Sequence, residues 1–255
     1  MPLLQGRTIL VMGIANRWSL AYAIAQSLRR EGAELVLTYQ AERVKKSVED
    51  LGRDLGARRI SLCDVGQDAS VEALFAGLAA DRIRLDGVVH SIAFAQQQDL
   101  ERAFEQTGRA GFTLALDISA YSLVTVAHHA APLMADGGGI VTLSYLGATR
   151  AVPNYNVMGV AKAALESSVR YLASELGPRR IRVNAISAGP VKTASARAIK
   201  GFTSILDHVA ERAPLRRATD PAEVGDTALF LLSDLGRGVT GDTVFVDSGY
   251  HIMGI

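Results

Sequence analysis

Residues 8–25 have the sequence TILVMGIANRWSLAYAIA, and the fold of the chain can be inferred from them. Thr8–Met12 is a short, nearly continuous apolar run, as expected of a strand buried on both faces of a parallel sheet. Gly13 allows the backbone to turn tightly after this strand, and Ser19 lies where an amphipathic pattern begins. The stretch therefore predicts a strand, a glycine turn and a helix, which is the first unit of an α/β fold.

Strand and helix signals alternate along the rest of the chain. Further strands are predicted at Glu34–Tyr39, Arg59–Cys63, Gly87–Ile92, Ile140–Ser144, Ile181–Ile186 and Thr243–Val246. Helices are predicted at Ser19–Glu31, Ala41–Leu55, Ser70–Asp81, Gly111–Met134, Tyr155–Leu176 and Pro221–Ser233, and irregular structure at Ala93–Gly108 and Ala188–Leu215. Crossovers of this length predict a single-domain, doubly wound, Rossmann-type parallel sheet of about seven strands with helices on both faces.

Two helices carry explicit end signals. Asp220-Pro221-Ala222-Glu223 offers an acidic N-cap, a proline at the first helical position and a glutamate three residues after the cap. Gly177-Pro178 is expected to end the helix that starts at Tyr155.

The composition indicates a soluble globular protein without a charged binding face. The chain has 255 residues, of which 49% are hydrophobic and 21% charged, and its 27 basic residues nearly balance 26 acidic ones. No global basic field is left to hold nucleic acid or an anionic membrane, so we expect neither partner. The N-terminus enters a strand without a charged and apolar leader, and no continuous apolar run reaches the roughly 18 residues of a membrane span.

Cysteine and histidine usage agree with this interpretation. Cys63 is the single cysteine, which excludes an internal disulfide and a thiolate metal cluster and fits a reducing compartment. The histidines show no metal-ligand spacing: His90, His128, His129, His208 and His251. We therefore predict a cytoplasmic protein without a metal site.

In doubly wound sheets, ligands bind beyond the carboxyl ends of the strands. Gly13 and Ser19 offer a tight turn and a hydroxyl near a helix N-terminus, which favours a phosphate, although ordinary turn chemistry stays an alternative because two of the usual three glycines are missing. Gln40 can hold ribose hydroxyls without a charge. Three basic residues could instead accept a 2′-phosphate or form a solvated helix face: Arg43, Lys45 and Lys46.

The ends of the third and fourth strands also suit a nucleotide. Asp64 can accept from an adenine amino group, and the Val65 amide can reach a ring nitrogen, although Asp64 could simply cap a turn. The small residues of Ser91-Ile92-Ala93 permit close approach of a ribose.

A second informative stretch combines Ser144-Tyr145, Tyr155, Met158 and Lys162 at a predicted strand-to-helix corner. Lys162 follows Tyr155 by seven residues, so the two side chains lie about two turns apart on one face if Tyr155 opens the helix. A phenol has a pKa of about 10, and a nearby positive charge favours its ionised form, so that it can give up a proton or a hydrogen bond near neutral pH. The alternative is that the tyrosines are ordinary half-buried aromatics and Lys162 is a solvated helix lysine.

Along nearly its whole length the chain resembles the short-chain dehydrogenase/reductase superfamily, and within it the NADH-dependent enoyl-acyl carrier protein reductases of bacterial fatty-acid synthesis. The resemblance is carried by the segments GIANRWSLAYAIA, REGAELVLTYQ, CDV, VHSIAFA, LSYLGATRAVPNYNVMGVAKAALE and RVNAISAGPVKT. Most superfamily members place a catalytic serine thirteen residues before a Tyr-x-x-x-Lys motif, but Tyr145 and Met158 occupy those positions here. The Tyr-x6-Lys spacing of Tyr155 and Lys162 distinguishes enoyl reductases from ketoreductases of the same fold.

The resemblance implies a reaction. NADH, or less readily NADPH, would deliver hydride to the β-carbon of a trans-2-enoyl thioester, and negative charge would form on the thioester oxygen. Tyr155 would donate a hydrogen bond to that oxygen, and Lys162 would hold the nicotinamide ribose hydroxyls and add positive potential. Tyr145 would be a second, weaker contributor that lines the acyl pocket.

The resemblance also implies two sets of binding residues in a single dinucleotide-binding and catalytic domain, residues 1–255. The dinucleotide would contact Gly13, Ser19, Leu20, Gln40, Asp64, Val65, Ile92, Lys162, Val191, Thr193 and Ala194. The substrate would contact Ala95, Tyr145, Tyr155, Met158, Ala196 and Ile199. Residues 194–206 would cover the acyl chain, although an amphipathic helix packed on its own domain would also explain Ala196 and Ile199.

The implied partners are the acyl carrier protein that presents the enoyl group and further copies of the chain in a homotetramer. The helices Gly111–Met134 and Tyr155–Leu176 would pair between subunits. Candidates to meet the acidic carrier are Arg197, Lys200, Arg212, Arg216 and Arg217. The chain departs from the family at Ala93, where glycine is common, and at Thr203 and Ser204, where basic residues often follow the phenylalanine.

Two other functions remain open at this point. A 3-ketoacyl thioester reductase of the same superfamily would need a serine and a tyrosine where the chain has Tyr145 and Met158. A non-enzymatic dinucleotide-sensing module would bind NADH without turnover. Neither function requires the displaced tyrosine.

Overall fold

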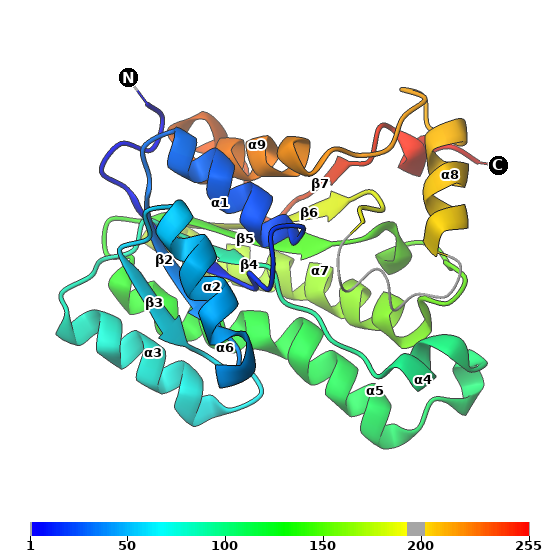
Figure 1. Cartoon of the computed structure of the whole chain (residues 1–255), viewed down its shortest axis with the longest axis horizontal. Helices are drawn as coiled ribbons and strands as arrows, with labels where there is room; N and C mark the ends of the chain where they lie inside the picture. Colours follow the sequence, from blue (N-terminus) through cyan, green and yellow to red (C-terminus); the bar gives the residue numbers. More distant parts are fainter. Residues whose placement is uncertain (1, 193–201, 255) are drawn as a thin grey trace.

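The computed structural model describes residues 2–192 and 202–254 of the chain. In this part of the chain, parallel strands form one seven-stranded sheet in the order β3-β2-β1-β4-β5-β6-β7 (Figure 1). The strands are β1 Thr8–Met12, β2 Glu34–Tyr39, β3 Arg59–Leu62, β4 Gly87–His90, β5 Gly138–Ser144, β6 Ile181–Ala188 and β7 Thr243–Val246. The strand order reverses between β1 and β4, where doubly wound folds bind their ligands. The predicted fold class is confirmed.

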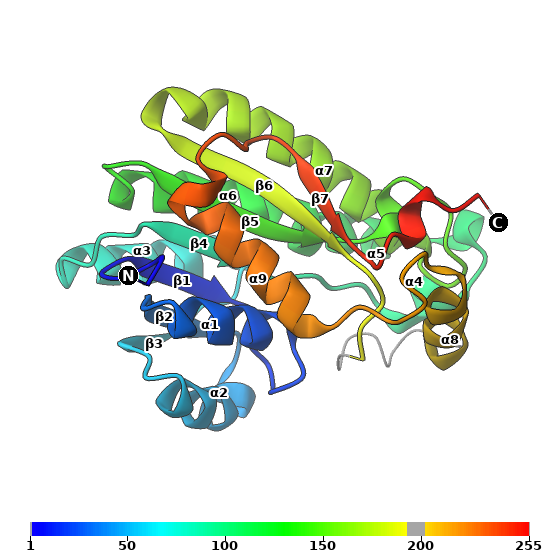
Figure 2. The same cartoon turned by 90° about the horizontal axis from the view of Figure 1, so that it is seen from above.

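Helices cover both faces of this sheet (Figure 2). They are α1 Leu20–Arg30, α2 Glu42–Asp54, α3 Asp68–Ala80, α4 Gln97–Glu101, α5 Arg109–Leu116, α6 Ser122–Ala130, α7 Asn156–Leu176, α8 Phe202–Arg212 and α9 Pro221–Leu232. Helices α1, α2 and α9 contribute buried residues to the hydrophobic cluster on one face. Helices α3, α6 and α7 contribute to the cluster on the other face.

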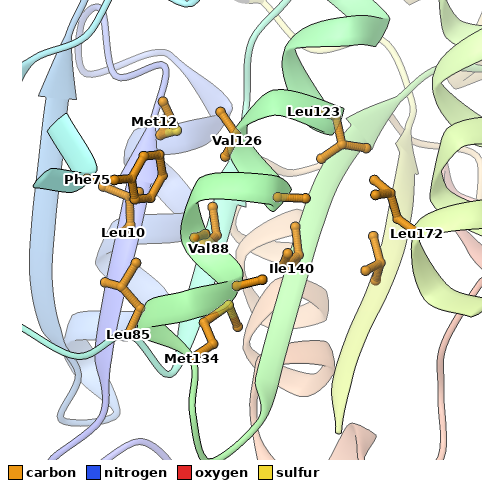
Figure 3. Close-up of a cluster of buried hydrophobic side chains, with 14 of the residues drawn as sticks. Leu10, Met12, Phe75, Leu85, Val88, Leu123, Val126, Met134, Ile140 and Leu172 are labelled. Carbon is orange, nitrogen blue, oxygen red and sulfur yellow. The ribbon is translucent and has the colours of Figure 1, made fainter. Parts of the chain in front are cut away.

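Every residue of β1 is buried, which explains why its sequence lacks polar alternation. Leu10 points into one cluster and its neighbour Val11 into the other. Figure 3 shows Leu10, Val88 and Ile140 of three strands on the same side of the sheet as Leu123 of α6. The sheet is therefore the central layer of the protein, and both of its faces need apolar side chains.

The predicted strand limits differ from the observed ones by at most two residues, as at the start of β5. This strand starts at Gly138, two residues before the predicted start, although glycine is a poor strand former. A Cβ atom on Gly138 would lie 2.3 Å from the carbonyl oxygen of Asp86, and its φ is +149°. Close packing of the backbone, which local propensity does not reveal, therefore requires glycine at this position.

The end signals of α9 and α7 are confirmed. The Asp220 carboxylate accepts from the Ala222 amide at 2.9 Å, and the Glu223 carboxylate accepts from the Asp220 amide at 3.0 Å. Helix α7 ends at Leu176, directly before Gly177.

Irregular structure was predicted for residues 93–108 and 188–215, and this is wrong where each segment contains a helix. Helix α4 lies within residues 93–108 and has five residues, too few to show a helical period. Helix α8 lies within residues 188–215 and buries Leu206 and Val209, whose spacing of three residues is helical. The predicted cover segment falls partly on residues 193–201, which are outside the described residues.

The predicted helix Gly111–Met134 is a composite helical stretch. It consists of α5, a π-helical turn Asp117–Tyr121, α6 and a 3-10 turn Ala131–Leu133. The stretch Arg109–Leu133 has 25 residues and a window of mean hydropathy 1.5, so by length and composition alone it is apolar enough to cross a membrane. Half of this window is buried inside the protein, where α6 packs on the sheet, α3 and α7. Its apolarity is therefore that of a core helix.

Candidate active site

Gly13 brings the ends of β1 and β4 together at the reversal of strand order. Its φ is +97°, and a Cβ atom at this position would lie 2.0 Å from the carbonyl oxygen of Ser91. A side chain would therefore clash with backbone, and the loop after β1 can take this path only with glycine. The tight turn predicted at Gly13 is present in the structure.

The loop after Gly13 leads to an open helix N-terminus. The Ser19 hydroxyl, predicted to bind a phosphate, donates to the Asn16 carbonyl oxygen at 2.6 Å. In this structure it therefore stabilises the loop between Gly13 and α1. No side chain caps α1, which starts at Leu20. The free amides of its first turn, together with the helix dipole, are suited to bind an anion such as a phosphate.

The ends of β2 and β3 hold the next predicted residues. Gln40 is exposed directly after β2, as a ribose ligand must be. Asp64, which follows β3, accepts from the Gly66 amide through Oδ1 at 3.2 Å. This oxygen therefore caps a turn, which is the alternative role that the sequence left open for Asp64. Val65 is buried in the core, and Lys45 pairs with Glu42 on the surface of α2.

The remaining described cofactor candidates follow other strands of the same sheet. Ile92 is partly buried after β4, and Val191 is half-buried after β6. In a parallel sheet the carboxyl ends of all strands lie at one edge, so these residues lie at the same edge as Gly13. Thr193 and Ala194, predicted to contact the cofactor, and Ala196 and Ile199, predicted to contact the substrate, lie outside the described residues.

Ser119 supports the loop that holds predicted site residues, and sequence reasoning missed it. It is fully buried in the π-helical turn, and its hydroxyl accepts from the Phe94 amide at 2.9 Å and donates to the Phe94 carbonyl at 3.0 Å. It thereby fixes the loop after β4, which runs from Ser91 to Gln96. A serine inside an apolar helical pattern was the available signal, because such a hydroxyl needs a partner when it is buried.

Tyr145 and Tyr155, the predicted catalytic tyrosines, lie against each other in the candidate site. Tyr145 directly follows β5, and Tyr155 is the N-cap residue of α7, as the predicted corner requires. Their ring centroids are 4.8 Å apart with an interplanar angle of 67°, an edge-to-face contact. A Cβ atom on Gly147 would lie 2.4 Å from the Tyr155 ring, so glycine at this position makes room for the pair.

The expected ionisation of the phenols is corrected by their surroundings. Burial, and then the neighbouring Tyr145, raises the pKa of Tyr155 far above its ordinary value. Burial, and then Tyr250, raises the pKa of Tyr145 to about 12. Partial removal from water disfavours the charged phenolate, and no opposing effect of the lysine charge is found on either phenol. Both phenols are therefore neutral hydrogen-bond donors at neutral pH.

Lys162 is buried, which rules out the solvated-lysine alternative. Only 5% of its surface is exposed, and its Nζ donates to the Leu143 carbonyl oxygen at 2.7 Å. Burial lowers the pKa of Lys162 to about 8, against the raising effect of the Glu166 charge. Sequence reasoning missed Glu166, which lies four residues further along α7 and accepts from the Ser144 hydroxyl at 2.5 Å.

A small apolar cluster joins the predicted substrate residues. Met158 is buried in it, and Ala95 and Tyr155 pack against it. Residues from the loop after β4 and from α7 are thus brought together, although more than fifty positions separate them in sequence.

A cavity of about 880 Å³ opens beside Tyr145. Its other walls come from the loop 150–153, from α8 through Ser204 and Ile205, and from the C-terminal Tyr250 and His251. The described part of the predicted cover segment therefore borders a space adjoining the tyrosine pair.

A doubly wound parallel sheet, a glycine turn beneath an uncapped helix and a tyrosine-lysine pair at the end of β5 together define a short-chain dehydrogenase/reductase. The family model described as enoyl-(acyl carrier protein) reductase matches residues 13–251, and the chain belongs to this family.

Close relatives support this assignment over the full length. The chain is 54% identical to the NADH-dependent enoyl-[acyl-carrier-protein] reductase FabI of Bacillus cereus, with 100% of each chain covered. It is 52% identical to the NADPH form of Staphylococcus aureus, covering 98% of each chain. Identity to the NADH form of Escherichia coli is 47%, with 99% of this chain and 97% of the relative covered.

Solved structures agree. The Bacillus cereus enzyme with NADP⁺ and an indole naphthyridinone superposes with a TM-score of 0.98 at 53% identity over 100% of both chains. The Anaplasma phagocytophilum enzyme with NAD gives a TM-score of 0.96 at 48% identity, covering 99% of this chain and 97% of that one. The predicted family, fold and activity, enoyl-thioester reduction by an oxidoreductase of fatty-acid synthesis, are confirmed.

Proposed function

We propose that Tyr155, Tyr145 and Lys162 carry out the reduction of the trans-2 double bond of enoyl thioesters in this protein, with NADH as reductant. Two observations carry this proposal: the edge-to-face phenol pair, and the buried Lys162 ammonium that donates to Leu143, two residues before Tyr145. The bound cofactor supplies the hydride for the β-carbon, and the protein residues orient and polarise the substrate.

Tyr155 stabilises the charge that develops on the thioester oxygen. Its neutral phenol keeps its proton and donates a hydrogen bond where the negative charge grows. A preorganised donor of this kind contributes about 2.7–4 kcal/mol to transition-state stabilisation. Tyr145 lies against the Tyr155 ring and lines the cavity, so it holds the donor in place and borders the acyl group.

Lys162 binds the cofactor sugar. An ammonium has three N–H donors, and the Leu143 carbonyl takes one of them, which leaves the others for ribose hydroxyls. The phosphates are suited to the amides at the start of α1, where Gly13 leaves room for close backbone approach. Gln40, Asp64, Val65, Ile92 and Val191 complete the proposed dinucleotide site along the sheet edge.

We assign the preference to NADH rather than NADPH. Gln40 is exposed and uncharged, and can hydrogen-bond ribose hydroxyls. Lys45, one of the three basic candidates for a 2′-phosphate, pairs instead with Glu42 at 3.4 Å and lies over the Tyr39 ring. Relatives of both preferences exist, so the comparison of the two cofactors belongs in the first assay.

The thioester is presented by acyl carrier protein, whose acidic surface needs basic residues near the cavity. Arg212 at the end of α8 and the adjacent Arg216 are exposed and fit this role. Arg217 fits it less well, because it forms an ion pair with Glu223. Arg197 and Lys200 lie outside the described residues.

We further propose a cytoplasmic homotetramer. Helix α7 exposes Val160 and 71% of Tyr171, and the adjoining π-helical turn exposes Tyr121. Large apolar side chains on two neighbouring helices are typical of a subunit contact. The single cysteine, Cys63, is free and buried, which fits a reducing compartment.

The assignment is tested by following NADH and NADPH oxidation with a short trans-2-enoyl thioester. We expect turnover with NADH, a severe loss in Lys162→Ala, and a smaller or substrate-dependent loss in Tyr155→Phe. Tyr171→Phe, near the C-terminal end of α7 and 71% exposed, is the control and should behave as the intact protein. Reduction of acetoacetyl thioester without turnover of crotonyl thioester would favour the ketoreductase instead. NADH binding without any turnover would identify a sensing module.

A further inference from the structure

The last residues of β5 and the residue after it each contact a different group of the site. The Thr142 hydroxyl lies 2.9 Å from His90 Nδ1, and the Leu143 carbonyl accepts from Lys162. The Ser144 hydroxyl donates to Glu166, and Tyr145 faces the cavity. The proposed mechanism uses Tyr145 and Lys162 but leaves the buried pair Ser144 and Glu166 without a role.

Glu166 is a carboxylate at a buried position, where charged side chains are rare. It is 8% exposed, and a buried charge is costly unless it is hydrogen-bonded or balanced by an opposite charge. Ser144, itself 5% exposed, supplies a hydrogen bond of 2.5 Å to Oε1, within the range for a hydroxyl on an ionised acceptor. The bond ties α7 to the end of β5, directly beside Tyr145.

The opposite charge is Lys162, one helical turn away on the same face of α7. The two side chains do not form a contact ion pair, since Lys162 donates to Leu143 and Glu166 accepts from Ser144. The carboxylate therefore acts on the ammonium through space across a buried region, where a charge is weakly screened. This arrangement leaves the remaining N–H donors of Lys162 free to meet a ligand.

Other ionisable groups that face this region carry no charge near neutral pH. His90 on β4 is fully buried, and burial followed by the Lys162 charge lowers its pKa to about 3. Tyr155 and Tyr145 stay neutral because burial raises the pKa of each phenol. Among these described neighbours, Glu166 is the one that favours the protonated form of Lys162.

We propose that Glu166, held by Ser144, is a positioning residue that keeps Lys162 in its ammonium form for binding the nicotinamide ribose. The inference rests on the proposed role of Lys162 in cofactor binding. Glu166 touches neither substrate nor cofactor in this scheme and acts entirely through Lys162.

The sign of the effect follows from the charges. Burial already brings the pKa of Lys162 down to about 8, and loss of the Glu166 charge lowers it further. The ammonium is then lost at a lower pH, so NADH binding should weaken earlier as the pH rises. Well below this range Lys162 is protonated in both proteins, and their affinities for NADH should be similar.

The experiment measures the dissociation constant of NADH by its fluorescence between about pH 6 and about pH 9.5, around the Lys162 pKa. Glu166→Gln removes the charge but keeps an oxygen that can accept from Ser144. Its binding midpoint should move down by about one pH unit, which is up to about tenfold weaker binding at the alkaline end. Ser144→Ala, which loosens the carboxylate but keeps its charge, should give a smaller shift in the same direction.

Two controls make the result specific. Glu175→Gln removes an exposed carboxylate from the same helix and should leave the pH profile unchanged. Lys162→Met should bind NADH weakly and lose the alkaline transition, because the titrating group is gone. If Lys162→Met keeps that transition, another group causes it and the inference is wrong.

A Glu166→Gln variant with the pH profile of the intact protein would overturn the inference and leave Glu166 as a merely structural group. If this variant does not fold, the Ser144→Ala profile decides, and an unshifted profile there overturns the inference. Turnover of the enoyl thioester by the intact protein is measured separately. An intact protein that binds NADH but reduces no enoyl thioester would contradict the proposed function and leave the binding profile as the test of Glu166.

Discussion

Tyr155 shows how strongly a residue depends on its surroundings. The sequence spacing places Lys162 close to it, which favours ionisation, whereas burial in the folded chain keeps the phenol protonated. Tyr155 can therefore donate a hydrogen bond to a developing oxyanion without first losing its own proton. The chemistry assigned to the residue is unchanged, but its protonation state is the opposite of the one expected from the neighbouring charge.

Gly13 yields a prediction at this scale. Gly13→Ala should strongly destabilise the protein and abolish NADH binding, because the new methyl group would lie 2.0 Å from the Ser91 carbonyl at a φ of +97°. Thermal unfolding and NADH fluorescence measure the two effects. Gly6→Ala is the matched control, since Gly6 has a φ of +74° but no atom within 4 Å of a new Cβ.

Left-handed strain alone costs about 1–3 kcal/mol, so Gly6→Ala should fold and bind NADH as the intact protein does. Equal losses of NADH binding in both variants would show that the backbone conformation, and not the contact with Ser91, sets the requirement at Gly13.

At the scale of elements, the π-helical turn between α5 and α6 supports the candidate site. A π turn inserts one extra residue into a helix and is frequent at functional sites. Here it presents Ser119 to both backbone groups of Phe94 and so fixes the loop that follows β4. The long helix thus has two roles: its inner face packs in the core, and its interruption shapes the edge of the site.

Removal of the Ser119 hydroxyl should loosen this loop. Ser119→Ala removes both hydrogen bonds to the Phe94 backbone, each of which contributes about 0.5–1.5 kcal/mol to stability. We expect a lower melting temperature and a raised KM for NADH, as measured by thermal unfolding and steady-state kinetics. Ser168→Ala is the control, because that hydroxyl bonds only to the Ala164 carbonyl of its own helix. Unchanged kinetics in Ser119→Ala would contradict the proposed fixing of the loop.

At the scale of the whole molecule, one edge of the sheet holds the proposed site and one exposed helix pair offers the proposed subunit contact. Both depend on α7, whose N-terminal end carries Tyr155 and Lys162 and whose outer surface exposes Val160 and Tyr171. Assembly and catalysis are therefore expected to be coupled through this helix.

The assembly is tested by size-exclusion chromatography with light scattering. The intact protein should have the mass of a tetramer, and Tyr171→Glu should give smaller species, because a buried unpaired charge at the contact is costly. Leu62→Glu is the control, because Leu62 is an exposed apolar residue at the C-terminal end of the edge strand β3, outside the proposed contact. This variant should remain tetrameric. A monomeric intact protein, or an unchanged Tyr171→Glu tetramer, would contradict this assignment.

Much of the fold could be predicted because its signals are local. The continuous apolar run Thr8–Met12 and the capping box at Asp220 each act within a few residues, and both are found as expected. Gly138 and helix α4 were missed for opposite reasons. Gly138 is required by the carbonyl of Asp86, far away in sequence, and α4 is too short to show a period.

The linear order of residues already established the strand and helix alternation, the Tyr-x6-Lys spacing and the family. Those properties depend on side-chain type and local spacing, which the chain carries before it folds. Only the tertiary structure determined the neutral state of Tyr155, the hydrogen bonds between Ser119 and the Phe94 backbone, and the hydrogen bond from Ser144 to Glu166. Each of these results from desolvation or from contacts between distant segments, and neither exists until the sheet and its helices exclude water.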